Sequence, residues 1–387
     1  MKRLILFLTC TIFPLTGTNY ADTSAITGIV SARITQDGRP LLWQNLQSDV
    51  EIVQCRYFRG PTYHFMGMIV GQDTSGVFAG LNTAGFALAI SKSAFSGKSP
   101  ELAAIFIKYA LGTCGRVDEF EFLLSKTTNP SAGQIAFACM DSYGEAAIFE
   151  VPNPIRFSLN PIASPEGFIV RAGFTLTGTL SSGPEFWRYH RAGQLLQEAH
   201  SANQLNPSTI LRKVLRDVQT LQLDPYPLPF EGQVEGAPNG YVKCIGSINQ
   251  CFTRYGIVIH GVRTDEKPEF STLWAVLGEP LCGIAVPLWP ITGAVPRECS
   301  GKNPLLYNRT RLFEKTVYNH NGYPYYVNTF ELAHPQHGLW MKLEAIQERI
   351  FQQTRAHKIL WHRSPTYRKD MLDFQMKTAE DLGRQLY

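Results

Sequence analysis

The chain lacks the short motifs that mark the commonest enzyme classes. Its 387 residues contain no G-x-S-x-G turn, no phosphate-binding loop, no H-E-x-x-H pair and no G-x-G-x-x-G fingerprint. Lipases, nucleotide-dependent enzymes and zinc proteases therefore lose their main support. Charge is also sparse, at 18% charged residues and a net charge of +4, and no run of Lys and Arg alternates with aromatic residues. We expect a globular protein that does not bind nucleic acid.

Long hydrophobic runs are missing as well. Residues 4–13 form an apolar run that follows Lys2 and Arg3 and precedes small and polar residues up to Ala21. This layout is typical of a secretory signal peptide, because the run is shorter than the roughly 20 residues that a membrane span needs. The alternative is a short membrane anchor. We expect residues 1–21 to be removed, the mature protein to be secreted or periplasmic, and no membrane contact afterwards.

Cysteine and histidine provide no metal motif. The sequence has eight cysteines, and seven remain once Cys10 is removed with the signal, so at least one thiol stays free. Cys244 and Cys251 flank a short loop, where either a disulfide or two buried thiols fits. His334 and His337 in H-P-Q-H are more typical of a surface loop than of a zinc site. We predict neither a metal nor a cofactor.

The most informative stretch is residues 25–49. Apolar and polar residues alternate from Gly28 to Thr35, Gln36-Asp37-Gly38 is a turn signal, and residues 41–43 resume an extended run. This pattern predicts a β-hairpin. A hairpin directly after an export signal would carry a new N-terminus, whose α-amino group can act as a base for its own side chain.

The remaining pattern alternates strands with pairs of helices. Expected strands cover 51–57, 63–70, 77–80, 86–90, 134–140, 145–151, 167–176, 255–260, 273–277 and 284–288, and expected helices cover 101–111, 117–125, 187–199, 207–218 and 333–361. Such an order favours an α+β sandwich in which helices cover two sheets. The Pro- and Gly-rich segment 223–240 is typical of a long surface loop.

Four separated motifs carry a resemblance to a known family. These are T-Q-D-G-R-P-L-L-W-Q-N, G-L-N-T-A-G-F-A-L-A, V-R-A-G-F-T-L-T-G and L-W-A-V-L-G-E-P-L-C-G-I-A-V-P-L-W. Together they resemble the isopenicillin N acyltransferase family of N-terminal-nucleophile hydrolases, which is related to the choloylglycine hydrolases. The resemblance implies a four-layer αββα sandwich over residues 22–296, with a helical extension at 297–387. It also implies hydrolysis or acyl transfer at a linear amide bond of a small substrate.

The resemblance places the family's chemistry at three positions that differ here. The family uses an N-terminal Cys as nucleophile, an Asp that orients its amine, and an Asn that helps to hold the oxyanion. These positions correspond to Ala25, Gln47 and Gly173. An alanine methyl cannot attack a carbonyl, and an oxyanion donor alone is worth roughly two to three orders of magnitude in rate. We expect a catalytically impaired protein, a pseudoenzyme retained for ligand binding.

The alternative is an active amide hydrolase or acyltransferase with a displaced nucleophile. Thr23, Ser24 and Thr27 carry hydroxyls within two residues of Ala25, and processing before one of them would expose it. Asp49 lies two residues beyond Gln47 and would replace the missing carboxylate.

Three further residues are predicted to line a substrate pocket: Trp43, Asn82 and Arg171. Two of them have a simpler alternative. Asn82 can instead occupy a tight turn, and Arg171 can be a surface charge or the partner of a buried carboxylate.

Overall fold

The computed structural model describes most of the chain. The described residues are 24–92, 101–127, 135–151, 154–160, 162–173, 183–219, 227–233, 237–318 and 325–386. The predicted signal peptide at 1–21 and the candidate nucleophile Thr23 lie outside them, as do residue 134 and residues 174–176, 223–226 and 234–236 of the predicted segments.

Sheet A contains the predicted hairpin at its centre. Its strands follow the order β10 (Phe168–Arg171), β1 (Ser24–Val30), β2 (Leu41–Gln47), β12 (Thr253–His260), β13 (Thr272–Leu277) and β14 (Val286–Leu288). All neighbours are antiparallel, and β1 pairs with β2 from Ser24 opposite Gln47 to Val30 opposite Leu41. The hairpin expected from the alternation of residues is confirmed.

Sheet B is a meander whose strands follow the order of the chain. It runs through β3 (Val53–Arg59), β4 (His64–Val70), β5 (Ala79–Asn82), β6 (Ala87–Lys92), β7 (Ile135–Met140), β8 (Ala146–Val151) and β9 (Ile155–Ser158). Each strand pairs antiparallel with the next. The strands expected at 77–80, 86–90 and 145–151 overlap β5, β6 and β8 of this sheet, and the described part of the strand expected at 134–140 is β7.

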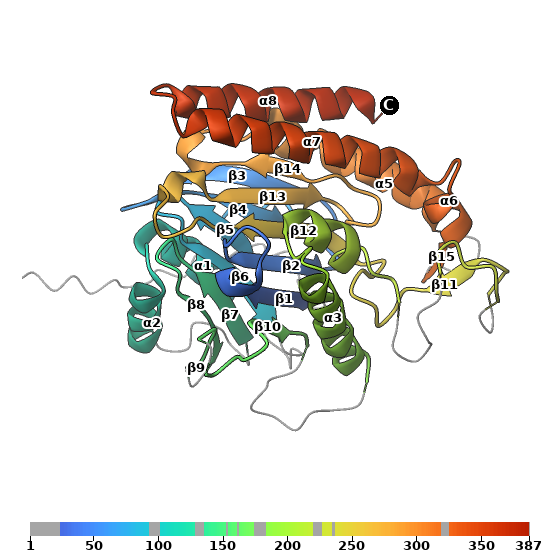
Figure 1. Cartoon of the computed structure of the whole chain (residues 1–387), viewed down its shortest axis with the longest axis horizontal. Helices are drawn as coiled ribbons and strands as arrows, with labels where there is room; N and C mark the ends of the chain where they lie inside the picture. Colours follow the sequence, from blue (N-terminus) through green and yellow to red (C-terminus); the bar gives the residue numbers. More distant parts are fainter. Residues whose placement is uncertain are drawn as a thin grey trace, which may run out of the picture.

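The two sheets pack face to face, and helices cover both outer faces (Figure 1). Sheet B is covered by α1 (Glu101–Thr113) and α2 (Val117–Lys126); Phe120 of α2 contacts Phe137 and Phe149 edge to face. Sheet A is covered by α3 (Pro184–Ser201), α4 (Pro207–Thr209) with its π-helical continuation Ile210–Val214, and α7 (Leu339–Trp361). The structure is the predicted α+β four-layer αββα sandwich.

The C-terminal part is mainly helical. It contains α5 (Leu305–Val317), α6 (Thr329–Ala333), α7 and α8 (Tyr367–Gln385), and α7 and α8 lie side by side above sheet A (Figure 1). The single helix expected at 333–361 is wrong at its start, because Pro335 and Gly338 separate α6 from α7. Pro lacks the N–H that a helix interior needs.

Short elements complete the chain. They are the 3-10 turns Ala32–Ile34, Pro268–Phe270, Pro290–Thr292 and Arg297–Cys299, and a two-stranded sheet of β11 (Tyr241–Lys243) and β15 (Tyr326–Asn328). The helix expected at 207–218 is also shorter than predicted, because α4 changes into the π-helical turn at Ile210. Within the described residues, helices long and apolar enough to cross a bilayer are absent.

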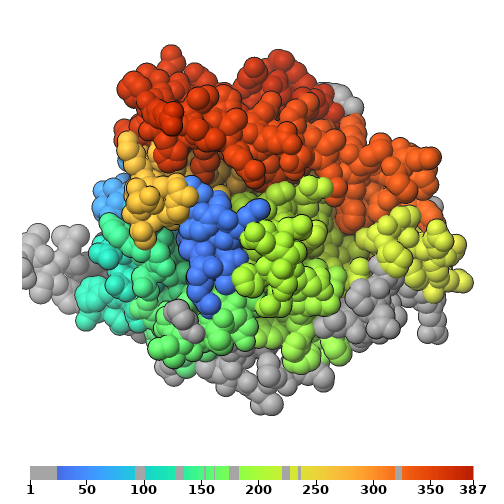
Figure 2. All heavy atoms as spheres, viewed as in Figure 1, coloured from blue at the N-terminus to red at the C-terminus, as the bar shows by residue number. Residues whose placement is uncertain are grey.

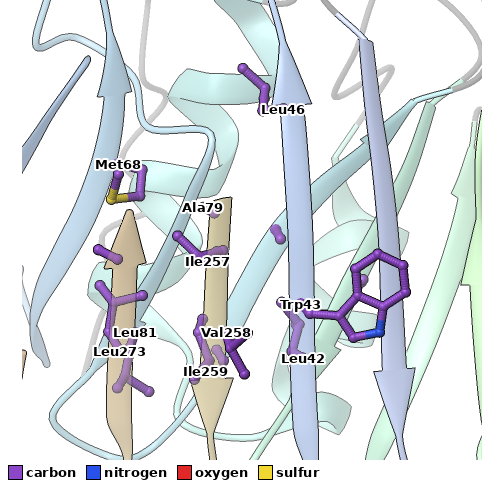
Figure 3. Close-up of a cluster of buried hydrophobic side chains, with 14 of the residues drawn as sticks. Leu42, Trp43, Leu46, Met68, Ala79, Leu81, Ile257, Val258, Ile259 and Leu273 are labelled. Carbon is purple, nitrogen blue, oxygen red and sulfur yellow. The ribbon is translucent and has the colours of Figure 1, made fainter. Parts of the chain in front are cut away.

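The core lies between the sheets (Figure 3). Sheet A contributes its inward side chains, and sheet B contributes side chains from β4 and β5 that face them. The buried members drawn there include Leu42, Leu46, Ile257, Ile259 and Leu273 from sheet A, and Met68, Ala79 and Leu81 from sheet B. Removing this apolar surface from water stabilises the face-to-face packing.

Trp43 lies on the opposite face of sheet A. Its indole ring reaches over the neighbouring strand β1, where Gly28 is its cross-strand partner (Figure 3). A Cβ atom at Gly28 would lie 2.4 Å from Cε2 of Trp43, which is closer than atoms can approach. Gly28 is therefore required by the packing of Trp43.

We expect Gly28→Ala to lower the free energy of unfolding by about 1–3 kcal/mol, because the added methyl group overpacks the site of Trp43. Gly193→Ala is the matched control, since the nearest atom to its new methyl would be Cε2 of Phe168 at 3.9 Å. It lies inside α3, where Ala favours the helix by up to about 1 kcal/mol. Urea denaturation measures the free energy of unfolding of both variants and of the parent. Equal stability of Gly28→Ala and the parent would show that Trp43 does not lie on Gly28.

Candidate functional site

The two faces of β1 have different surroundings. Thr27 faces sheet B, because its hydroxyl donates to the carbonyl oxygen of Ile90 on β6 at 3.2 Å. Side chains alternate along a strand, so Ala25 faces sheet B as well, while Ser24 and Gly28 face the helices on the outer side. Position 25, where the resemblance expects the nucleophile, therefore lies in the layer between the sheets.

The three positions that the resemblance marks for catalysis lie at one end of β1. Ala25 is 1% exposed and pairs with Leu46, and its neighbour Ser24 pairs with Gln47. Gly173 follows Arg171, the partner of Thr27, so it also lies at this end of the strand. The structure brings Ala25, Gln47 and Gly173 together, and none of the three offers a nucleophile or a carboxylate.

Gly173 is bound by an acidic residue. Its N–H donates to Oε2 of Glu185 at 2.7 Å, and Glu185 also accepts hydrogen bonds from Nη1 of Arg188 at 2.9 Å. A Cβ atom at Gly173 would lie 2.7 Å from Cγ of Glu185. With Glu185 in this position, a side chain at residue 173, where the resemblance expects an oxyanion donor, would clash with it. The carboxylate of Glu185 also disfavours a second negative charge beside it.

Ser24 has a hydrogen-bond partner that is not a base. Its hydroxyl donates to Oε1 of Gln47 at 3.2 Å, and Nε2 of Gln47 donates to the hydroxyl of Thr253 at 3.4 Å. A side-chain amide cannot take up a proton near neutral pH, so this contact does not activate the hydroxyl. The alternative carboxylate, Asp49, lies beyond the end of β2 and is exposed.

Thr27 belongs to a buried polar network. Besides its bond to Ile90, its hydroxyl accepts a hydrogen bond from Nε2 of Gln44 at 3.3 Å, and Nε2 of Gln44 also donates to the carbonyl of Ile90. The phenol of Tyr255 donates to Oε1 of Gln44 at 2.6 Å. Burial raises the pKa of Tyr255, so this phenol stays neutral. The network joins the two sheets and leaves Thr27 fully buried.

Arg171 forms an ion pair between the sheets. Its Nε donates to Oε1 of Glu150 on β8 at 2.9 Å, its Nη1 donates to the carbonyl of Val170 at 3.1 Å, and its guanidinium lies 4.6 Å from the ring centre of Phe157. Burial lowers the pKa of Arg171 to about 10, and the charge of Glu150 opposes this effect. Of the alternatives open from sequence, Arg171 is the partner of a buried carboxylate.

Asn82 occupies a turn and the base of α1. Its amide nitrogen donates to the carbonyls of Leu111 at 3.0 Å and Cys114 at 2.7 Å, and its Oδ1 accepts from the N–H groups of Ala84 and Phe86, both at 3.0 Å. All of its hydrogen-bonding capacity is used.

The predicted substrate pocket of Trp43, Asn82 and Arg171 is therefore corrected. Asn82 lies between sheet B and α1, Arg171 lies between the sheets, and Trp43 lies on the helix-covered face of sheet A. Sequence reasoning placed them together because each belongs to a matched motif. Strand alternation separates them into three layers.

The cysteines and histidines offer no further centre. Cys244 and Cys251 are free thiols, so the disulfide alternative is wrong for this structure. His334 and His337 stack at 3.7 Å between ring centres. The described part of the chain holds no group of three or more His, Cys, Asp or Glu side chains arranged for a metal ion.

A cavity of about 750 Å³ lies at the opposite end of the hairpin, around its turn. Its lining includes Asp37 and Arg39 from the turn, His260 from the end of β12, and Lys358 from α7. Sequence reasoning missed it, because α7 lies outside the family resemblance. The available signal in the sequence was Thr354 and Lys358, polar residues four apart on the helix expected at 333–361, which places them on one face of it.

Comparisons with known proteins find similar solved structures but no matching family. No family model matches the chain, and no curated protein matches it. Similar solved structures include a Caenorhabditis elegans ortholog of N-acylethanolamine-hydrolyzing acid amidase, with 13% identity over 60% of this chain and 92% of that one. A mutant of conjugated bile acid hydrolase from Clostridium perfringens has 14% identity over 65% of this chain and 89% of that one. Penicillin V acylase from Agrobacterium tumefaciens has 17% identity over 68% of this chain and 86% of that one.

These three structures have TM-scores of 0.38, so they carry no argument about function. The αββα architecture rests on the sheets and helices of this chain itself. The isopenicillin N acyltransferase family in particular stays a prediction.

We expect Glu150→Gln to lower the free energy of unfolding by about 3 kcal/mol or more, because it leaves the guanidinium of Arg171 buried without a countercharge. The double variant Glu150→Leu with Arg171→Met should recover most of this loss. Glu145→Gln is the control, since Glu145 pairs with Arg156 at 3.0 Å but is half exposed, and it should cost no more than about 1 kcal/mol. Chemical denaturation at pH 7 measures all of these variants beside the parent. Equal losses in the two single variants would contradict a buried inter-sheet pair.

Proposed function

We propose that this chain is an exported protein that keeps the amide-hydrolase sandwich for binding a small ligand and has lost the family reaction. The observation that carries this proposal is the position of Ala25. Its buried methyl group faces the inter-sheet layer at the end of β1, where the resemblance expects a nucleophilic thiol. The export signal at 1–21 remains part of the proposal.

The neighbouring hydroxyls do not replace the missing thiol. Ser24 is one residue away and points to the opposite face of sheet A, since its side chain bonds Gln47. Thr27 is two residues away and points to the correct face, but its hydroxyl is fully buried and hydrogen-bonded on both sides. A nucleophile has to reach a bound carbonyl, and neither group can do so from these positions.

The position of the oxyanion donor supports the same conclusion. Glu185 occupies the space beside Gly173 and takes its N–H. A tetrahedral intermediate formed there would meet a carboxylate in place of a donor, which raises its energy. Restoring the nucleophile alone should therefore not restore turnover.

One observation favours the second candidate, an active amide hydrolase or acyltransferase. Ser24 is the first residue of β1 and is half-buried, so processing directly before it would create an α-amino group beside its own hydroxyl. Processing before Thr23 or Thr27 would do the same for those residues. Mature N-terminal sequence and covalent labelling distinguish this candidate from the first.

We expect the mature protein to begin upstream of Ser24, and to hydrolyse a panel of acyl amides no faster than buffer. Ala25→Cys should remain at the buffer rate, because Gln47 and Gly173 still lack the supporting groups, and Ser24→Ala should be unchanged. Intact-mass spectrometry with an activated acyl ester reports any acyl-enzyme. An acyl adduct on the parent protein that disappears in Ser24→Ala would establish the second candidate.

A further inference from the structure

The cavity at the hairpin turn has the size and walls of a small-molecule site. Its volume of about 750 Å³ falls within the roughly 300–1,000 Å³ that is usual for ligand pockets. The hairpin turn in blue, the start of α4 in green and α7 in red meet on the face shown in Figure 2. Phe351, Thr354, Arg355 and Lys358 line it from one side of α7, at spacings of three and four residues.

The acidic residues at the hairpin turn are already neutralised. Oδ2 of Asp37 lies 2.8 Å from Nη1 of Arg39 and 3.0 Å from Nε2 of His260. Glu266 accepts hydrogen bonds from the guanidinium of Arg39, and Nη2 of Arg263 donates to it at 3.0 Å. Five lining residues are Lys or Arg and three are Asp or Glu, so the lining has an excess of positive charge.

Three lining cations, Arg355, Lys358 and Arg363, form no ion pair with a described carboxylate, and Lys358 is the least exposed of them. Its ammonium donates one hydrogen bond, to the hydroxyl of Thr272 at 2.9 Å, and no carboxylate of the described chain forms an ion pair with it. The hydroxyl of Thr272 cannot accept a second hydrogen bond from Lys358, because it also accepts one from Nε1 of Trp289 at 3.0 Å and donates one to the carbonyl of Phe270 at 3.2 Å. An ammonium has three N–H donors, so two are available to a ligand.

Four buried polar atoms of the lining lack hydrogen-bond partners within the described residues: Oδ1 of Asp37, Nε2 of His260, Nε1 of Trp274 and Oγ1 of Thr354. The first two belong to residues that contact each other, since Nε2 of His260 lies 3.0 Å from Oδ2 of Asp37. The other two belong to Trp274, which is 3% exposed, and to Thr354, which is 2% exposed. Leaving such groups unpaired costs free energy, so their presence beside a cavity indicates a partner that the chain itself does not supply. The indole can only donate, and the hydroxyl can donate.

The remaining wall is aromatic. Phe270, Trp274 and Phe351 all line the cavity, and the rings of Trp274 and Phe351 lie 4.4 Å apart between centres. An apolar body would pack on these rings, while its acceptor atoms would meet the donors. A neutral ligand would leave the ammonium without a countercharge.

We propose that this cavity binds a small organic carboxylate with an aromatic or alkyl body, whose carboxylate pairs with Lys358 and accepts from Trp274 and Thr354. This site lies at the other end of β1 from Ala25, and it stands whether or not the family reaction has been lost. It depends on α7, which belongs to the helical part of the chain beyond the family resemblance.

Isothermal titration of the full-length mature protein tests the site. The probes are straight-chain alkanoates of six to fourteen carbons and arylalkanoates such as 1-naphthylacetate, each compared with its primary amide. We expect at least one carboxylate to bind, and to bind about tenfold or more tightly than its amide. A charge-assisted hydrogen bond in a partly dry site accounts for a difference of about this size.

Lys358→Met should remove the preference for the carboxylate and change the affinity for the amide by less than about threefold. Lys342→Met is the matched control, because Lys342 is an exposed lysine of α7 outside the cavity lining, and it should bind as the parent does. Trp274→Phe keeps the ring, loses one donor and should weaken carboxylate binding severalfold. This second variant keeps the test decisive if Lys358→Met does not fold. The proposal is overturned if no carboxylate binds better than its amide, or if both cavity variants bind like the parent.

The pH dependence provides an independent check. Burial lowers the pKa of Lys358 to about 8, Arg39 adds to this effect, and Glu266 and Asp37 oppose it. Arg263, Glu348, Arg355 and Arg363 complete the charged lining of the cavity. The charged and titratable groups that interact electrostatically with Lys358 are Asp37, Arg39, His260, Glu266 and His362.

None of these neighbours changes charge between pH 7 and pH 9.5. The pKa of Asp37 is below its usual range, because the contacts with His260 and Arg39 outweigh burial, and the pKa of Glu266 is lowered because its contacts with Arg39 and Arg263 outweigh burial. Burial lowers the pKa of His260 and of His362, so both imidazoles are neutral throughout.

Carboxylate affinity should therefore fall as pH rises through about 8 in the parent, because the ammonium of Lys358 loses its charge, and it should stay level in Lys358→Met. Titration at several pH values in this window measures both proteins. A level profile in the parent would contradict the role of Lys358. Amide turnover measured on the same samples tests the proposed function separately.

Discussion

The alternation of side chains along β1 and β2 is the constraint on which the rest of this structure depends. Both strands lie in the middle of sheet A, so every side chain on them enters either the layer between the sheets or the layer under the helices. Thr27 and Gln44 enter the first layer, where they bond the backbone of sheet B. Gly28 and Trp43 enter the second, where a missing side chain makes room for a large one. A shift of one residue would exchange the two sets and leave both layers unpacked.

The same constraint limits how the family chemistry could be replaced. A nucleophile has to face the inter-sheet layer, so only residues an even number of positions from Ala25 have the correct direction. Ser24 fails this condition, and Thr27 meets it only inside a network that consumes its hydroxyl. The buried pair of Arg171 and Glu150 then fixes β10 against β8 at the same level of the sandwich. The polar side chains in this layer therefore hold the two sheets together.

Local sequence patterns predicted the elements better than they predicted the site. The hairpin, the two strands at 80–90 and the helices at 101–125 depend on neighbouring residues, and the structure has them close to where they were expected. Periodicity shows that a strand has two faces but does not show what lies against each. Trp43 and Asn82 were therefore assigned to one pocket, although Gly28 and the end of α1 determine where they lie. The cavity at the hairpin turn was beyond local reasoning, because it forms only when α7 packs against residues from the beginning of the chain.

The two ends of the central hairpin thus differ in what they present to a ligand. At the Ala25 end, the carboxylate of Glu185 accepts a hydrogen bond from the N–H of Gly173 and pairs with Arg188, so a ligand there would meet an acceptor. At the turn, Asp37 and Glu266 are neutralised, whereas Lys358, Trp274 and Thr354 have donors that no acceptor among the described residues occupies. Unpaired donors beside a cavity cost stability, and a helix that serves only to cover a sheet gains nothing from placing them there. The binding site that we propose therefore depends on α7, and it lies at the end of the hairpin opposite Ala25.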